Sequence, residues 1–472
     1  MALQRAKAFA RTKNTRYLVL GLVFLLLLIT CLYTLDPDFG WHLSAGQYTL
    51  AHGIPATDIY TYTAANFPWI QHEWFADVVN ATLYHYGGFT LLAVVYSIVW
   101  TASLWLMVKK LTWKSGLVVL VTAIALAQFV AIRDTAWTLL FLVLIHRMFN
   151  RFRNYIPLLF VVWANMHGGF VVGFVYLGWR ILYDKQWRSA WIVPAAIMAS
   201  FINPYGIGLY REILSTLLDP TLHTKIQEWQ SWAIGGSLII VPLLWFISLV
   251  PDIRHRRWKN LLQFDTLLFA ASLLSIRHYM LFATFALPRM VTFYQGFTLK
   301  NWRPNLRQDN IRHIVRIFAV ESVILAAGIL VLWSTIVALQ GPLQQFSAKD
   351  SLPTAAINSL RATPCQGNIF NDYNIGGYLI WKYPEQKVYI DGRMPSWQLN
   401  GTNYMDNYLR IFTDPHFQRQ QFRQYHIACA IVLQSSSLTK SLVGQGWQAT
   451  TDPHSNWVLL RKNSAFAQKR PL

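Results

Sequence analysis

Long apolar runs separated by short basic clusters fill most of the first 340 residues. The first run, from Leu18 to Leu35, has about the length that crosses a bilayer as a helix. Lys and Arg gather at alternate ends of the later runs, as they do in the cytoplasmic loops of membrane proteins. The pattern predicts a mainly α, polytopic helical membrane protein with about eleven spans. They lie near residues 17–35, 89–108, 115–132, 135–149, 155–183 (two short spans), 189–202, 237–251, 261–275, 279–296 and 317–340.

Two details of this pattern set the predicted orientation. A basic segment, residues 1–16, precedes the first run and is therefore expected in the cytoplasm. The run 155–183 is divided at Asn165–Gly169, because a Gly pair ends a helix easily. An odd number of spans within 17–340 places the rest of the chain on the extracytoplasmic side of the cytoplasmic (inner) membrane. One span more or fewer would place it in the cytoplasm.

Residues 341–472 follow a different pattern. Short runs typical of strands alternate with runs typical of helices, which predicts a small C-terminal α/β domain, extracytoplasmic in this topology. Cys365 and Cys429 both fall in this domain. They would pair in an oxidising compartment if the fold brought their backbones close enough, which a sequence separation alone does not decide.

The composition supports the membrane interpretation. The chain of 472 residues is 54% hydrophobic and only 13% charged, whereas soluble domains carry about 25% charged residues. The formal net charge of +20 would suggest a nucleic-acid partner for a soluble protein. Here the basic residues lie between apolar runs, so we expect membrane lipids and no nucleic acid as partners. The sequence leaves the oligomeric state open.

The first external loop, residues 36–88, contains no Lys or Arg. Asp36 and Asp38 open it, directly where the chain leaves the membrane. A carboxylate there can remove a proton from an acceptor hydroxyl, and two can hold a divalent cation such as Mg²⁺ or Mn²⁺. Either Asp would equally serve as the N-cap of a following helix. The acids of this loop are Asp36, Asp38, Asp58, Glu73 and Asp77.

Candidate substrate-binding residues lie on the same predicted side of the membrane. Arg and protonated His suit a phosphate group, which accepts charge-assisted hydrogen bonds. Taken singly, each cation at a membrane edge is also explained by a side chain that reaches the lipid head groups. Several on one face predict a cationic counterpart to the acidic loop. The candidates are His42 and Glu73 in the loop, and Arg133, His167, Arg277 and His278 at the outer ends of spans.

Short motifs extend over nearly the whole chain. They include Asp38…Trp41-His42-Leu43, Gly53-Ile54-Pro55, Glu73-Trp74, Trp163–Gly169, Asn203-Pro204-Tyr205-Gly206, Gly376-Gly377-Tyr378-Leu379 and Asp391-Gly392-Arg393. In these motifs the chain resembles a large family of bacterial membrane proteins of mostly unassigned function. The acidic residues directly after the first span also resemble the C-type glycosyltransferase superfamily. Its members take a sugar from a polyprenyl-phosphate or polyprenyl-diphosphate carrier.

The superfamily resemblance implies a catalytic base or substrate-orienting acid in the first loop, either Asp36 or Asp38. It also implies a lipid-linked donor whose phosphate is held by outer basic residues, and these map loosely onto Arg133, His167, Arg277 and His278. Some members use a divalent metal and others do not. By this analogy we expect a cell-envelope glycosyltransferase, integral to the membrane, that acts at the extracytoplasmic face.

Two other classes of function fit the same features. Broken helices such as the one at Asn165–Gly169 also occur in transporters. A transporter or flippase for a lipid-linked or anionic substrate is therefore one alternative. It would carry ionisable groups in mid-span and show a repeated half, and neither is clear in the sequence. The other alternative is a non-catalytic assembly scaffold that binds through its terminal domain.

Overall fold

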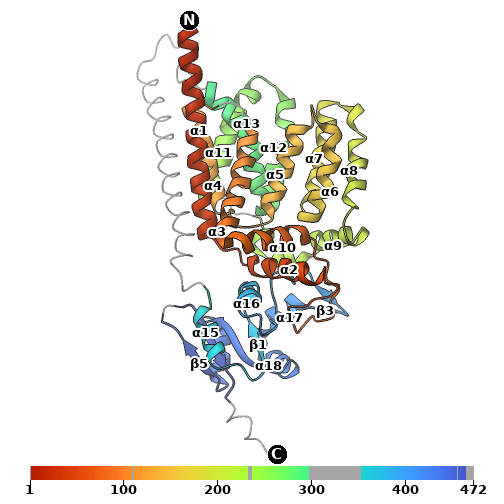
Figure 1. The fold of residues 1–472 in the computed structure, drawn as a ribbon, viewed down its shortest axis with the longest axis vertical. Helices are drawn as coiled ribbons and strands as arrows, with labels where there is room; N and C mark the ends of the chain where they lie inside the picture. Colours follow the sequence, from red (N-terminus) through yellow and green to blue (C-terminus); the bar gives the residue numbers. More distant parts are fainter. Residues whose placement is uncertain (1, 109–110, 232–235, 297–351, 454, 464–472) are drawn as a thin grey trace, which may run out of the picture.

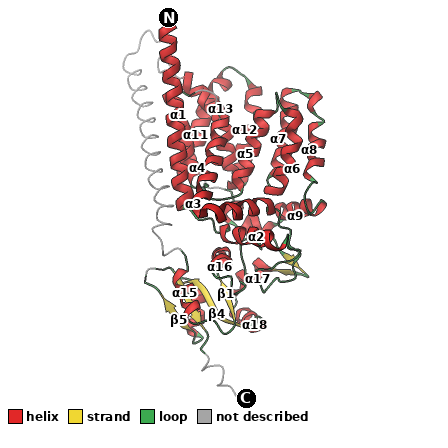
Figure 2. Ribbon diagram, viewed as in Figure 1, coloured by secondary structure: helices red, strands yellow, loops and turns green. Residues whose placement is uncertain are grey.

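The computed structural model describes residues 2–463 except 109–110, 232–235, 297–351 and 454. The chain is mainly helical, with a small α/β region at its C-terminal end (Figure 1; Figure 2). The predicted span 317–340 and the start of the predicted C-terminal domain, 341–351, lie outside the described residues.

Most helices of the N-terminal part stand side by side in one layer, and others lie across its lower end (Figure 1). The upright helices are α1 (Ala2–Tyr33), α4 (Trp113–Ala127), α5 (Thr135–Met148), α6 (Ile156–Met166), α7 (Phe170–Asp184), α8 (Ile192–Ser200), α11 (Ile240–Arg254), α12 (Phe264–Leu274) and α13 (Tyr279–Gly296). The helices α2 (Phe39–His52), α9 (Ile207–Leu218) and α10 (Pro220–Lys225) lie at the lower end of the layer (Figure 1), and α3 (Trp74–Met107) joins two helices across a kink at Gly88.

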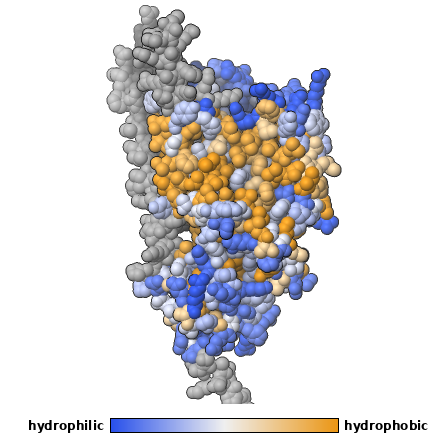
Figure 3. Space-filling view, viewed as in Figure 1, coloured by the Kyte–Doolittle hydropathy of each residue, from blue (hydrophilic) through white to orange (hydrophobic). Residues whose placement is uncertain are grey.

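The surface of the helical layer is apolar. Two segments are long and apolar enough to cross a membrane, namely Arg16–Tyr33 within α1 and the whole of α3, while α4, α5 and α12 are apolar but shorter. Apolar residues form a belt on the visible face, with hydrophilic surface above and below it (Figure 3). Exposed apolar patches of this extent are typical of membrane contact. The surface is consistent with a membrane location, and the count of eleven spans stays a prediction.

Glycines break the helices near the predicted boundaries. Gly88 has φ 60° and ψ −160°, so α3 is interrupted there, next to the predicted start of a span at residue 89. The helix break predicted at Asn165–Gly169 is confirmed, because α6 ends at Met166 and α7 begins at Phe170. Both breaks lie near the end of the layer at which α2 and the C-terminal region are found.

The C-terminal region is built around a four-stranded sheet with the strand order β1-β4-β6-β5. β1 pairs with β4 in parallel, and the other neighbours are antiparallel. A disulfide joins Cys365 to Cys429 of β4. The elements are α15 (Thr354–Ala362), β1 (Asn368–Asn371), α16 (Gly376–Lys382), β2 (Gln398–Leu399), β3 (Thr402–Asn403), α17 (Tyr404–Ile411), α18 (Pro415–Gln424), β4 (Ile427–Leu433), α19 (Ser437–Gly444), β5 (Gln448–Thr451) and β6 (Trp457–Arg461).

Two glycines bring α2 into direct backbone contact with α16. A Cβ at Gly40 would lie 2.1 Å from the carbonyl oxygen of Gly377, and a Cβ at Gly377 would lie 2.5 Å from that of Pro37. Neither position has room for a side chain while the backbones keep this distance. The glycines therefore set how closely the start of α2 approaches the C-terminal region.

The loop between α2 and α3 belongs to the core of the C-terminal region. Trp69 packs in the same hydrophobic cluster as the strands β1, β4 and β6. The Tyr62 hydroxyl donates a hydrogen bond to the Ile369 carbonyl at 2.9 Å. Arg393 forms a buried ion pair with Asp58, with 2.8 Å between Nη2 and Oδ1. The loop and the C-terminal region are thus one packed unit at the end of the helical layer.

We predict that Gly40→Ala loosens this docking. The added methyl group overlaps a backbone carbonyl that cannot move by itself, and overpacking of this kind costs about 1–3 kcal/mol. The melting temperature of the purified protein in detergent should fall. Gly444→Ala is the matched control, since nothing lies within 4 Å of its Cβ position. Equal melting temperatures for both variants would contradict the prediction.

Candidate functional site

A cavity of about 690 Å³ lies where the helical layer, the loops at its end and the C-terminal region meet. Its volume is in the range of ligand-binding cavities, about 300–1,000 Å³. The C-terminal region contributes side chains such as Tyr373 and Trp397 to its wall. All the predicted site residues line this cavity except His278. Those that do are Asp36, Asp38, His42, Glu73, Arg133, His167 and Arg277.

Asp36 is engaged by an arginine. Its Oδ2 lies 2.6 Å from Nε of Arg133, which directly precedes the N-cap residue of α5. The Nη2 of Arg133 donates to Glu228, a residue of the short 3-10 helix Gln227–Trp229. The guanidinium therefore bridges the start of the loop after α1 and the segment that holds Glu228. A planar guanidinium with several donors is suited to this double role.

Asp38 is held between α2 and the C-terminal region. Its backbone N–H donates to Oδ1 of Asp36 at 2.9 Å. A Cβ at Gly392 would lie 1.7 Å from Oδ1 of Asp38, so the carboxylate occupies space that only glycine leaves open. Burial, followed by the neighbouring Asp36, raises the pKa of Asp38 to about 6, and His42 acts in the opposite direction. Its carboxylate forms no ion pair with Lys or Arg among those identified in the described residues.

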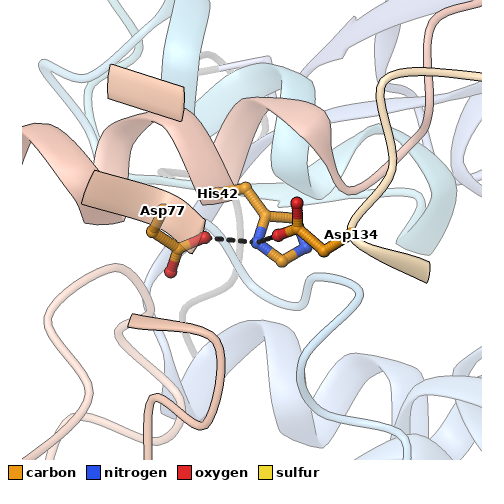
Figure 4. Close-up of side chains that lie close together, drawn as sticks. All are labelled: His42, Asp77 and Asp134. Atoms are coloured by element: carbon orange, nitrogen blue, oxygen red, sulfur yellow. Dashed lines mark hydrogen bonds and ion pairs between the residues drawn. The ribbon is translucent and has the colours of Figure 1, made fainter. Parts of the chain in front are cut away.

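His42 is the centre of an acidic cluster (Figure 4). Its Nδ1 lies 2.6 Å from Oδ1 of Asp77 and 3.6 Å from Oδ2 of Asp134, and its Nε2 lies 3.4 Å from Oε2 of Glu73. Burial alone would lower the pKa of His42, but Asp77, Glu73 and Asp134 outweigh it and hold that pKa well above its usual range. The three acids therefore favour the protonated form of His42.

In Asp77 and Asp134 the second carboxylate oxygen also accepts hydrogen bonds. Asp77 Oδ2 accepts a hydrogen bond from the Gln71 side-chain amide at 2.6 Å. Asp134 Oδ1 accepts from the Asn80 side-chain amide at 3.2 Å and from the Tyr96 hydroxyl. Each carboxylate thus presents one oxygen to His42 and anchors the other to neutral donors.

Glu73 lies among three histidines. Its Oε1 is 3.3 Å from Nε2 of His167 and 3.6 Å from Nε2 of His72, while Oε2 faces His42. Nδ1 of His167 accepts the backbone N–H of Gly169 at 2.8 Å, so Nε2 carries the proton that points at Glu73. Burial would raise the pKa of Glu73, but His72 and His167, with His42, hold it below its usual range.

The two predicted basic residues at Ile276–His278 differ in position. Arg277 lines the cavity, where its guanidinium carbon lies 4.5 Å from the ring centre of Trp229 and its Nε lies 3.8 Å from Oε2 of Glu228. His278 does not line the cavity, although it follows directly in the chain. Of the four outer residues expected to face one site as cations, Arg133, His167 and Arg277 line the cavity, and His167 is neutral because its Nδ1 accepts a hydrogen bond.

The predicted cation site can be tested against these contacts. Asp36 already holds a guanidinium, and a metal ion bound to it would be repelled by Arg133. His42, Asp77 and Asp134 instead offer three ligand atoms within 4.8 Å of one another. Asp134 Oδ2 is buried and has no hydrogen-bond partner among the described residues. The donor set around His42 fits a divalent cation better than Asp36 and Asp38 do.

Sequence reasoning missed several members of the site. Asp77 was counted among the loop acids without a role, and Asp134 follows Arg133 at the start of a helix as an ordinary N-cap would. His42 and Asp77 are 35 residues apart, so no local spacing could pair them. In the sequence, Arg393 stands out only as part of the motif Asp391-Gly392-Arg393. Its Nη2 pairs with both Asp58 and Asp391, and it lines the cavity from the C-terminal side.

No family model and no curated protein matches the sequence. Among solved structures, the archaeal oligosaccharyltransferase AglB from Archaeoglobus fulgidus, in complex with an inhibitory peptide and a dolichol-phosphate, aligns with a TM-score of 0.54 at 10% identity. The alignment covers 98% of this chain and 75% of AglB. The fold resembles that of an archaeal oligosaccharyltransferase. An Archaeoglobus fulgidus oligosaccharyltransferase in the apo form aligns with a TM-score of 0.50 at 11% identity, covering 89% of this chain and 69% of that one. At these identities the likeness concerns the fold alone.

Proposed function

We propose that the chain is an integral membrane glycosyltransferase that moves a sugar from a polyprenyl-phosphate-linked donor to an acceptor hydroxyl at the extracytoplasmic face. The observation that carries this proposal is the cavity at the end of the helical layer, in which a carboxylate, Asp38, shares the wall with Arg133 and Arg277. The oligosaccharyltransferase-like fold supports it, and one such structure is a complex with a dolichol-phosphate.

The position of the charged groups favours this class over a transporter. Transporter sites lie near the bilayer midplane between repeated halves. Here the ionisable residues of the cavity gather where the helical layer meets the C-terminal region, and Gly392 of that region touches Asp38. A site that needs an external domain for its wall is suited to chemistry on a lipid-linked group at the membrane surface.

In the proposed reaction, the acceptor oxygen bonds to the anomeric carbon of the sugar while Asp38 takes the hydroxyl proton. The bond between that carbon and the phosphate oxygen breaks, and the lipid phosphate leaves with the electron pair. Arg133 and Arg277 balance the negative charge of the leaving phosphate through charge-assisted hydrogen bonds. Asp36 and Glu228 fix Arg133 in the cavity wall. A single in-line displacement of this kind inverts the anomeric configuration.

Asp38 is assigned as the base because Asp36 already forms an ion pair with Arg133. General-base catalysis typically contributes about 10²–10⁴-fold, so Asp38→Asn should lower sugar transfer by at least about 100-fold. Asp36→Asn releases one side of Arg133 and should chiefly weaken donor binding. The measurement is transfer of radiolabelled sugar from a panel of polyprenyl-phosphate sugars in membranes that contain the protein.

The control for both variants is Glu385→Gln. Glu385 forms an exposed pair with Arg361, and exposed pairs of this kind contribute little. Its transfer rate should equal that of the unchanged protein. Full activity of Asp38→Asn in every membrane preparation would remove Asp38 from the mechanism.

A second prediction concerns the contact between Asp38 and Gly392. In Gly392→Ala the new methyl group displaces the end of the Asp38 side chain and leaves the backbone in place, so the melting temperature should change little. A misplacement of about 1 Å can cost about 100-fold in rate, and we expect a loss of that order in kcat. Gly444→Ala serves as the control. A lower melting temperature with an unchanged kcat for the folded protein would argue against a positioning role.

A third prediction concerns sidedness. The Cys365–Cys429 disulfide requires an oxidising compartment, which supports the extracytoplasmic side for the C-terminal region. In cells with an intact cytoplasmic membrane, an impermeant maleimide should label Glu385→Cys. It should label Arg188→Cys, placed at the cytoplasmic end of α7 by the basic-cluster topology, only after lysis. The reverse labelling pattern would invert the topology and place the cavity inside.

A further inference from the structure

We infer that the wall of the cavity formed by the C-terminal region binds the acceptor, and that this acceptor is a neutral carbohydrate. The acceptor role rests on the proposed function, which leaves the chemical class of the acceptor open. The wall includes Tyr373, Asn374, Arg393, Ser396, Trp397 and Tyr408.

Charge is distributed unevenly around the cavity. The helical part and its loops supply carboxylates, histidines and the guanidinium groups of Arg133 and Arg277. The described residues of the C-terminal region that line the cavity include one charged side chain, Arg393. Its Nη2 lies 2.8 Å from Oδ1 of Asp58 and 2.7 Å from Oδ2 of Asp391. With two carboxylates to one guanidinium, this wall has no surplus positive charge with which to bind an acidic acceptor.

Hydrogen-bonding groups nevertheless remain available on this wall. Nη1 of Arg393 is buried and has no hydrogen-bond partner among the described residues, although Nε and Nη2 are both engaged. Tyr373 and Ser396 line the cavity, and neither hydroxyl has a partner identified in the described part of the chain. Burial, followed by the charge of Asp38, raises the pKa of Tyr373 well above its usual range, so its hydroxyl keeps its proton. Unpaired buried donors are costly, and neutral hydroxyl oxygens of a ligand would satisfy them.

The aromatic side chains around these donors are held by fixed contacts. Phe67 stacks on Trp397 with the ring centres 4.2 Å apart. The guanidinium carbon of Arg393 lies 5.2 Å from the ring centre of Trp397, and the Tyr408 hydroxyl accepts the backbone N–H of Tyr373 at 3.1 Å. A preformed apolar wall with a few precisely placed polar groups is typical of sites for small organic ligands. A sugar, which combines apolar C–H groups with several hydroxyls, matches both parts of this wall.

The same wall is less suited to an extended peptide. Such peptides are held mainly by main-chain hydrogen bonds along the edge of a sheet. No residue of the described strands β1–β6 lines the cavity. The lining residues of the C-terminal region lie in the segments after β1 and before β2, and in α17. Side-chain donors of this kind recognise hydroxyl groups rather than a peptide backbone.

The first test measures binding without any donor. The full chain is reconstituted in lipid nanodiscs, because maltoside detergents are themselves carbohydrates, and is applied to a glycan array that holds neutral, sulfated and uronic-acid oligosaccharides. We expect binding to a subset of the neutral oligosaccharides. Tyr373→Phe removes one hydrogen bond and should weaken this binding about 2- to 10-fold. Ser396→Trp fills the space in front of the wall and should abolish it.

Tyr404→Phe is the matched control, since Tyr404 is a half-buried tyrosine of the same region that does not line the cavity. It should bind like the unchanged protein. Binding to acidic oligosaccharides alone, or to none, would overturn the inference, as would equal binding by Tyr373→Phe and Tyr404→Phe. The comparison of these two variants decides the matter even if Ser396→Trp fails to fold.

The second test separates this inference from the proposed function. Radiolabelled sugar transferred in membranes should enter a product that resists protease and shows a new glycosidic bond by linkage analysis. Tyr373→Phe should raise the KM for the acceptor and leave the KM for the donor unchanged. A protease-sensitive product would refute the carbohydrate acceptor and leave the glycosyltransferase in place. Binding on the array without transfer from any donor would support the saccharide site and refute the proposed function, and with it the acceptor role.

Discussion

The contact between Gly40 and Gly377 is the constraint on which the arrangement of the site depends. It lets α2 lie directly against α16, so that the first residues after α1 meet the C-terminal region. From this contact follow the position of Asp38 against Gly392 and the closure of the cavity on that side. Protein interiors are packed closely enough for a single methyl group to matter. The chemistry of the first loop is thus fixed by residues more than three hundred positions later in the chain.

Charge pairing divides the cavity into two parts. On one side Arg133 joins Asp36 and Glu228, and Arg277 approaches the same glutamate. On the other side His42 is surrounded by carboxylates. Buried ion pairs contribute little net stability once desolvation is counted, and removing one partner is costly. Stabilisation of the fold alone therefore does not explain an arrangement of this kind.

The sequence pattern was sufficient for the helical layer, the α/β character of the C-terminal region and the break at Asn165–Gly169, because these depend on local periodicity and on glycine. It also brought out the residues Asp36, Asp38, Arg133 and Arg277, whose charge is unusual in an apolar setting. It could not pair His42 with Asp77 and Asp134, nor separate His278 from Arg277. Those relations arise from the packing of α2, α3 and α5, which no periodicity encodes. The type of a residue was enough to propose its chemical role, whereas its contact partners could be identified only from the fold.

The shared core of the first loop and the C-terminal region has a consequence for synthesis of the protein. Tyr62 and Ile369 are 307 residues apart, yet a hydrogen bond joins them. Contacts over such separations form late, because the intervening chain must be placed first. The loop is synthesised early, and Trp69 and Asp58 lack their native partners until β1 and Arg393 have been synthesised. A chain that stops short of these residues is therefore a chain without a cavity, however well its helices are inserted.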